Sequence, residues 1–203
     1  MLTDRQLARI VGGSAPRRYG LVNRALKAND LRRLQRGLYM LNDRYRSHAC
    51  HPYHLAQHLL PGSYVSFETA LSYHGWIPEG VTVTASVSPG RKSRDYEHEE
   101  MGRLTFHPLA MNKLHFLELV ERVQVNRQSM LVAKPIRALM DLVCLRKIEW
   151  RGLDWLLNGL RIDSESLASV TKDELNTLKQ VYKQGKVQTF LMELTLALEL
   201  EDD

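Results

Sequence analysis

The chain has 203 residues, 44% hydrophobic and 25% charged, with a formal net charge of +5. This composition is typical of a globular protein, and no apolar run approaches the roughly 20 residues of a membrane-spanning helix. The N-terminus lacks the apolar stretch of a signal peptide, and Cys50 and Cys144 are too few for a disulfide framework, so we expect a cytoplasmic protein without membrane contact.

The charge is distributed unevenly along the chain. Residues 1–48 contain eleven of the 28 Lys and Arg residues and three of the 23 acidic residues, a local balance of +8. The remaining 155 residues contain seventeen basic and twenty acidic residues, a balance of −3. A basic module attached to a mildly acidic body is expected when one end of a chain meets phosphate; a basic but merely solvated surface is the alternative.

The basic module begins with two expected helices. Thr3 is suited to cap a helix that runs to about Val11, with Leu7, Ile10 and Val11 on its apolar side. Gly12 and Gly13 end that helix, and Ser14 is suited to cap a second helix to residue 28 or 29, in which Pro16 is tolerated in the first turn.

The outward side of this second helix is expected to be basic. At about 100° per residue, it contains Arg17, Gly20, Asn23, Arg24 and Lys27, whereas Arg18 falls near the apolar side. The glycine would allow a backbone to approach closely. Arginine suits guanine edges and phosphates, and asparagine suits adenine or phosphate.

The stretch "LRRLQRGLYML" at 31–41 predicts a hairpin after these helices. Residues 33–35 form its first strand, Arg36 and Gly37 the turn, and residues 38–41 the return strand. Two short helices followed by a hairpin match a winged helix-turn-helix, in which Arg32, Arg33 and Arg36 would contact DNA phosphates. The alternative is a helical hairpin that docks on a protein with the same basic face.

The polar segment "DRYRSHACH" at 43–51 marks the expected boundary between a domain at 1–48 and a domain at 49–203. A helix is expected from Pro52 to about Leu60. His54 and His58 lie one helical turn apart in it, but no third ligand is assured, so we expect no metal site.

The rest of the chain predicts a mixed body. A helix capped by Ser66 is expected at 67–73, and strands at 81–87, 103–107 and 122–126, with a charged loop at 89–100 between the first two. Pro135 opens an amphipathic helix, and three more helices are expected around 151–160, 171–184 and 188–200. The predicted fold class is therefore α+β, with an N-terminal winged helix-turn-helix and a larger α+β domain that ends in helices.

Three blocks together resemble one family. "QRGLYML" after two short helices, "YVSFETALSYHGWIPEG" followed by "VTVTASVS", and "VAKPIRALMDLV" are similar to the AbiEi-type antitoxins, predicted transcriptional regulators of bacterial toxin-antitoxin operons connected with phage resistance. The resemblance covers residues 1–147, its middle block is the most specific, and the last 55 residues match no motif.

The resemblance implies two activities. The winged helix would bind inverted repeats in the protein's own promoter, with two copies on the DNA, and act as a repressor. The C-terminal domain would counteract a nucleotidyltransferase-type toxin of the AbiEii class, without a requirement for direct contact. Glu68 and Asp141, both in the recognisable blocks, are the candidates for an antitoxicity surface, or for a polar pair in the body.

The sequence does not favour an enzyme or a cofactor. The Gly-Ser turn at 13–14 lacks the paired acids of a nucleotidyltransferase, and Glu97, Glu99 and Glu100 lie in a hydrophilic stretch without an apolar shell. No phosphate-binding loop or zinc-protease motif is present. The alternative is a nucleic-acid-processing enzyme whose active site in the C-terminal domain has no familiar motif.

Overall fold

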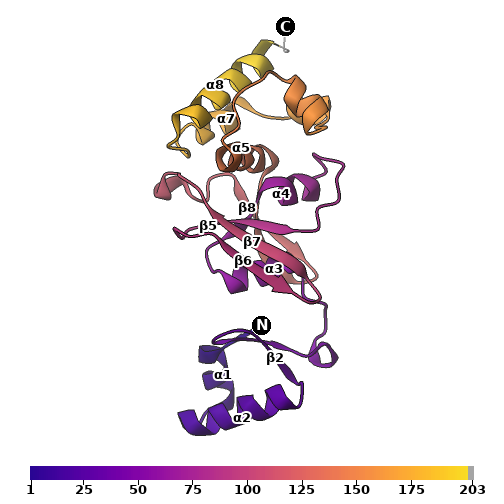
Figure 1. Cartoon of the computed structure of the whole chain (residues 1–203), viewed down its shortest axis with the longest axis vertical. Helices are drawn as coiled ribbons and strands as arrows, with labels where there is room; N and C mark the ends of the chain where they lie inside the picture. Colours follow the sequence, from indigo (N-terminus) through magenta and orange to yellow (C-terminus); the bar gives the residue numbers. More distant parts are fainter. Residues whose placement is uncertain (201–203) are drawn as a thin grey trace. The chain divides into compact units, whose positions relative to one another are not determined.

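The computed structural model describes residues 1–200 and divides the chain into two compact units, Met1–Pro61 and Gly62–Asp203, which we describe separately (Figure 1). The molecule is mixed α+β, as expected. The first unit extends past the expected boundary at residue 48 and includes the helix that follows it, where the Leu59 carbonyl oxygen accepts from the Gln35 side-chain amide at 3.2 Å.

The first unit contains three helices and a three-stranded antiparallel sheet of order β1-β3-β2. In chain order its elements are β1 (Leu2–Thr3), α1 (Asp4–Val11), α2 (Ala15–Lys27), β2 (Leu31–Gln35), β3 (Leu38–Leu41), the 3-10 turn η1 (Asp43–Tyr45) and α3 (Pro52–Leu59). The two helices and the hairpin confirm the predicted elements, whereas the short strand β1 was not foreseen.

Local signals explain how α1 and α2 begin. Thr3 and Gln6 form a reciprocal capping box, so that the Thr3 hydroxyl accepts from the Gln6 amide and the Gln6 side chain accepts from the Thr3 amide. Ser14 occupies the N-cap position of α2, as predicted, with an extended backbone, but its side chain makes no capping hydrogen bond.

A small core holds this unit together. Leu7, Leu31 and Tyr39 are buried, and Val22 and Leu26 of α2 pack against them only partly buried. No residue of α2 is fully buried. Ile10 was expected on the apolar side of α1 but is 71% exposed, and the residue of α1 that is buried in this core is Leu7.

Gly37 is needed at the hairpin turn for two reasons. Its φ of 78° is the left-handed region that favours glycine, and a Cβ there would lie 2.9 Å from the Asp4 carboxylate. The Asp4 amide donates to the Gly37 carbonyl oxygen at 3.0 Å. The hairpin turn is therefore tied to the first turn of α1.

The second unit is built on a six-stranded mixed sheet of order β6-β7-β5-β4-β9-β8. Its strands are β4 (Tyr64–Val65), β5 (Thr84–Ser88), β6 (Arg94–His98), β7 (Gly102–Pro108), β8 (Val120–Val125) and β9 (Gln128–Ala133), and its helices are α4 (Phe67–Tyr73), the 3-10 turn η2 (Lys113–His115), α5 (Pro135–Arg146), the π-helical turn η3 (Trp155–Gly159), α6 (Ser164–Ala168), α7 (Lys172–Leu178) and α8 (Gly185–Leu200). The neighbours β5–β7 and β4–β9 are parallel, and the other pairs are antiparallel.

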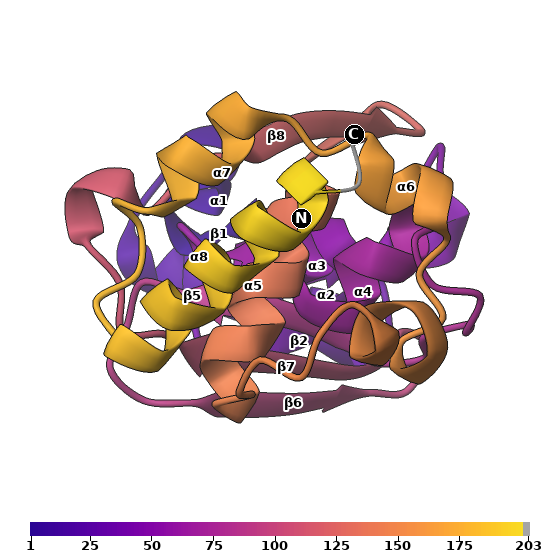
Figure 2. The same cartoon turned by 90° about the horizontal axis from the view of Figure 1, so that it is seen from above.

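Helices cover one face of this sheet in two tiers. Figure 1 shows α4 and α5 next to the strands, and Figure 2 shows α8 crossing over α5. Residues 136–144 of α5 are all buried, so this helix is enclosed on every side and lacks the polar outer face that was expected. None of the helices within residues 1–200 combines the length and apolar composition of a membrane crossing.

Several predictions for the second unit need correction. The charged stretch at 89–100 is not all loop, because residues 94–98 form the edge strand β6, where charged side chains are tolerated in solvent. The strands β4 and β9 were missed. Ser66 makes no capping hydrogen bond, and the helical segment expected at 151–160 contains only the short π-helical turn η3.

Candidate nucleic-acid interface

The first unit presents its cations on α2 and on the β2–β3 hairpin. Arg17, Arg24 and Lys27 are exposed on α2, and Arg33 and Arg36 are exposed on the hairpin. None of these five forms an ion pair with a carboxylate in the described part of the chain. Gly20 lies among the exposed positions of α2, and a Cβ there would meet only the Arg24 side chain at 3.8 Å. This side of α2 is therefore open to a bulky polyanion.

Two of the three acids of this unit are neutralised elsewhere. Asp30 accepts hydrogen bonds from Arg44 and, at 2.9 Å, from the Tyr45 hydroxyl, and these contacts lower the pKa of Asp30. Asp43 pairs with Arg46. These two acids thus pair with arginines that follow the hairpin, and the arginines of α2 and of the hairpin are not neutralised by them.

A groove of about 450 Å³ runs between α1, α2 and the hairpin. It brings together four of the predicted DNA-binding residues, Arg18, Asn23, Arg33 and Arg36. Tyr19, which is 72% exposed, also lines it and was missed in the sequence. Tyrosine hydroxyls often contact nucleic-acid phosphates, and an exposed aromatic residue within a basic stretch was the signal that could have identified it.

Asp4 is the carboxylate that lines this groove. It lies beside the hydroxyl of Tyr39, and burial, together with the Asp4 charge and hydrogen bond, raises the pKa of Tyr39. Asp4 thus has a partner within the fold, and it lies in the first turn of α1, where a negative charge suits the positive end of the helix.

Two predicted residues have roles that differ from the others. The Arg18 guanidinium donates to the Gly13 carbonyl oxygen and so braces the turn between α1 and α2. Arg32 is half-buried and alternates with Arg33 along β2, which places it on the opposite face of the hairpin from the groove. Of the three hairpin arginines, Arg33 and Arg36 therefore line the groove, and Arg32 does not.

The histidine-rich segment is explained by local contacts. The His51 imidazole accepts from the Tyr53 amide at 3.2 Å and caps α3. The rings of His54 and His58 lie 4.3 Å apart, and Nδ1 of His58 is 2.9 Å from the His54 carbonyl oxygen. Within residues 1–200 no group of three or more His, Cys, Asp or Glu side chains is placed to hold a metal ion.

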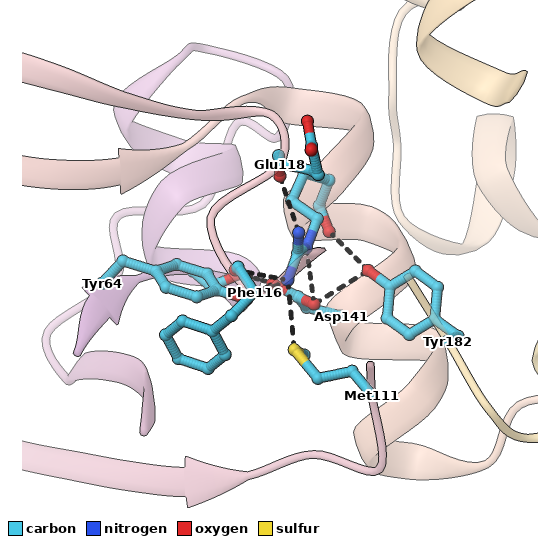
Figure 3. A network of polar contacts seen from close by, with 8 residues as sticks. Tyr64, Met111, Phe116, Glu118, Asp141 and Tyr182 are labelled. Atoms are coloured by element: carbon cyan, nitrogen blue, oxygen red, sulfur yellow. Dashed lines mark hydrogen bonds and ion pairs between the residues drawn. The ribbon is translucent and has the colours of Figure 1, made fainter. Parts of the chain in front are cut away.

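In the second unit, Asp141 belongs to a buried polar network (Figure 3). Its carboxylate accepts from Nε of Arg137 at 3.0 Å and from the hydroxyls of Tyr64, Ser66 and Tyr182 at 3.0, 2.7 and 2.8 Å. Arg137 and Asp141 are both 0% exposed. The expectation that Asp141 lies on an antitoxicity surface is therefore wrong, and its partner is Arg137 rather than Glu68.

The remaining donors of Arg137 are also used. Its Nη1 donates to the Glu118 carbonyl oxygen at 2.6 Å, and its Nη2 to the Tyr64 hydroxyl, to the Phe116 carbonyl oxygen and to the sulfur of Met111 (Figure 3). Burial alone would lower the pKa of Arg137, but the Asp141 charge raises it, so Arg137 keeps its positive charge. Burial and the same carboxylate raise the pKa values of Tyr64 and Tyr182. Because its groups satisfy one another, the network is suited to hold elements together rather than to react with a substrate.

The sequence carried only one hint of this network. Arg137 and Asp141 lie four residues apart on a helix of otherwise apolar residues, a spacing typical of a buried ion pair. Tyr64 and Ser66 precede α4 and Tyr182 precedes α8, so their convergence depends on the tertiary fold.

Glu68 remains at the surface, as expected. It lies in the first turn of α4, is half-buried, and forms an ion pair with Arg146 in the last turn of α5. Both side chains line a groove of about 440 Å³ with His107, whose pKa is lowered mainly by burial. Arg146, which the sequence did not single out, is thus the direct neighbour of the candidate residue Glu68.

Neither profiles of known protein families nor the sequences of curated proteins match this chain.

Proposed function

We propose that this chain is a DNA-binding antitoxin that represses its own toxin-antitoxin operon and counteracts a nucleotidyltransferase-type toxin. The observation that carries the proposal is the set of exposed cations on α2 and the hairpin, which have no carboxylate partners within residues 1–200. Phosphate neutralisation by such cations supplies much of the affinity of proteins for DNA.

The order of elements supports a winged helix-turn-helix for the first unit. A short turn containing Gly12 and Gly13 joins α1 and α2, and an antiparallel hairpin follows them. In such a module the second helix enters the major groove and the hairpin lies on the phosphates. Sequence choice would then belong to Arg17, Asn23, Arg24 and Lys27, and Arg33 and Arg36 would add phosphate contacts.

The antitoxin part of the proposal rests on the resemblance of three sequence blocks to AbiEi-type antitoxins. Two of these blocks meet in the second unit, because Tyr64 and Ser66 of one block donate to Asp141 of the other. These shared residues thus build part of the interior of the second unit, whereas Glu68 of the middle block reaches the surface and pairs with Arg146, which follows the third block. We place the antitoxicity surface there.

Fluorescence anisotropy with DNA from the protein's own upstream region tests the first activity. The full chain should bind this DNA on the order of 10³ times more tightly than scrambled DNA of equal length at physiological salt. Arg24→Glu should remove the preference, and Arg151→Glu, an exposed arginine of the second unit, is the matched control. Equal affinity of the unchanged chain for both DNAs would refute a specific repressor.

Growth rescue in cells that express the neighbouring toxin gene tests the second activity. Arg24→Glu should keep protection while repression is lost, and Glu68→Lys should lose protection while DNA binding is kept. Because Glu68→Lys also breaks an ion pair, the double variant Glu68→Arg, Arg146→Glu restores the pair with reversed charges and should remain unprotective. Full protection by both Glu68 variants would remove this surface from the proposal.

A further inference from the structure

A second groove lies where two parallel strands end. β5 and β7 are parallel neighbours in register, with Ser88 opposite Pro108, and both run into a groove of about 670 Å³. This volume is within the range of small-molecule sites, and the carboxyl ends of parallel strands are a common place for them.

Ser88 supplies a hydroxyl without a partner. It is only 3% exposed, it lines the groove, and its Oγ has no hydrogen-bond partner among the described residues. Buried hydroxyls are nearly always hydrogen-bonded, so a free one at a groove wall is suited to a bound polar group. Ser86, two residues earlier on β5, is also buried without a partner but does not line the groove.

The groove is positively charged. Arg91, which follows β5, and Lys113, the first residue of η2, both line the groove and are exposed. No carboxylate is among the lining residues. Neither cation forms an ion pair in the part of the chain that the structure describes. Two cations beside a buried hydroxyl favour an anion such as a phosphate or carboxylate.

The opposite wall is apolar and held in place. Met111 and Phe116 line the groove, and the sulfur of Met111 and the carbonyl oxygen of Phe116 accept hydrogen bonds from Arg137 of the buried network (Figure 3). Backbone bonds from the Asn112 amide to the Val181 carbonyl oxygen at 2.7 Å and from the Lys183 amide to the Ala110 carbonyl oxygen at 3.1 Å fix the same segment. A wall fixed in this way is preorganised for a flat apolar body.

We propose that this groove binds a small organic anion, with a phosphate or carboxylate head at Ser88, Arg91 and Lys113 and a flat apolar body against Met111 and Phe116. The site is in the second unit and does not depend on the proposed DNA binding.

Isothermal titration calorimetry on the full chain tests the site with four probes. Adenosine 5′-monophosphate and 1-naphthoate each carry a head and a flat body, whereas adenosine lacks the head and inorganic phosphate lacks the body. We expect at least one of the two complete anions to bind with a Kd below about 1 mM. Adenosine and inorganic phosphate, the two parts of adenosine 5′-monophosphate, should bind at least about tenfold more weakly than the complete anion. Binding of the phosphate compound alone or of the carboxylate alone would identify the head that the site prefers. Failure of both to bind at about 5 mM would overturn the proposal.

Matched variants show whether binding occurs in this groove. Ser88→Ala and the double variant Arg91→Gln, Lys113→Gln should each weaken the complete anion by about tenfold. Ser86→Ala controls for the loss of a buried hydroxyl from β5, and Arg151→Gln controls for the loss of an exposed cation; both should leave the affinity unchanged. Equal affinity of the double variant and the unchanged chain would show that the anion binds elsewhere.

Discussion

Arg137 in the second unit is surrounded by a carboxylate, two phenols and two carbonyl oxygens, whereas Arg17 and Arg24 in the first unit face solvent without a carboxylate partner within residues 1–200. The second unit thus uses its central cation to fix its own interior. The first unit keeps its cations available and holds itself together with a small core around Leu7, Leu31 and Tyr39. Under the proposed function, the same side chain serves stability in one unit and DNA recognition in the other, and burial with partners is what separates the two uses.

The largest expected effect is the loss of a buried charge partner. Asp141→Asn leaves Arg137 charged and buried, so the second unit should lose about 3–5 kcal/mol of unfolding free energy. All three tryptophans, Trp76, Trp150 and Trp155, lie in the second unit, so urea unfolding followed by tryptophan fluorescence reports on this unit alone.

Asp95→Asn is the matched control for that experiment. Asp95 pairs with Arg103 at the exposed edge of the same sheet, with about half of each side chain accessible, so its loss should cost less than about 1 kcal/mol. Similar costs for the two variants would contradict the contrast between a buried arginine, whose partners fix the fold, and an exposed arginine, whose partner contributes little to stability.

The next effect concerns recognition without stability. The double variant Arg17→Glu, Arg24→Glu replaces two exposed cations of α2 by anions, and we expect specific DNA affinity to fall by at least about 100-fold, because repulsion of phosphates replaces attraction. The measurement is anisotropy at fixed salt, with the circular dichroism spectrum as the check of folding. A loss of helix signal together with binding would show that these arginines also stabilise the unit.

A smaller effect separates the two faces of the hairpin. Arg33→Ala should weaken binding to all DNA sequences by a similar factor of about tenfold and reduce the salt slope by about one, as expected for one phosphate contact. Arg32→Ala on the opposite face should leave affinity within about twofold. If Arg33→Ala changed the preferred sequence instead, the hairpin would be reading bases.

The smallest expected effect is a pH dependence of the second unit. Mainly because of burial, the pKa of His107 lies below its usual value in the folded state, so the unfolded chain binds the proton more readily. The stability that depends on neutral His107 is fully present above about pH 6.5, the usual histidine pKa, and is lost as the pH falls below that value and through the lower pKa of the folded state. The unfolding free energy should therefore decline less between pH 7.5 and 5.5 in His107→Gln than in the unchanged chain, and equal declines would contradict this assignment.

The first unit was more predictable from sequence than the second because its signals are local. The cap at Thr3, the stop at Gly12 and the turn at Arg36-Gly37 each act within a few residues, and all three are observed. Solvent exposure was harder to predict: Ile10 has an apolar side chain in an amphipathic pattern, and its exposure depends on which tertiary contacts the helix makes.

The second unit shows what local signals miss. Strand β6 is rich in charged residues because it lies at a sheet edge, so its sequence resembles a loop. Asp141 looked like a surface residue because aspartate is seldom fully buried without partners, and those partners come from segments 41 to 77 residues away, apart from Arg137 one turn earlier on the same helix. Only the tertiary fold assembles them.

The bond between the Asp4 amide and the Gly37 carbonyl oxygen has a mechanical consequence. It joins the tip of the hairpin to the start of α1, and the bond from Arg18 to Gly13 braces the turn that leads into α2. These short links connect the hairpin to the basic helix α2 and fix the separation between the two elements. In the proposed complex with DNA, such a fixed separation would select the spacing between phosphates as well as their charge, so we expect a substitution at Gly37 to change the fit to DNA while every cation stays in place.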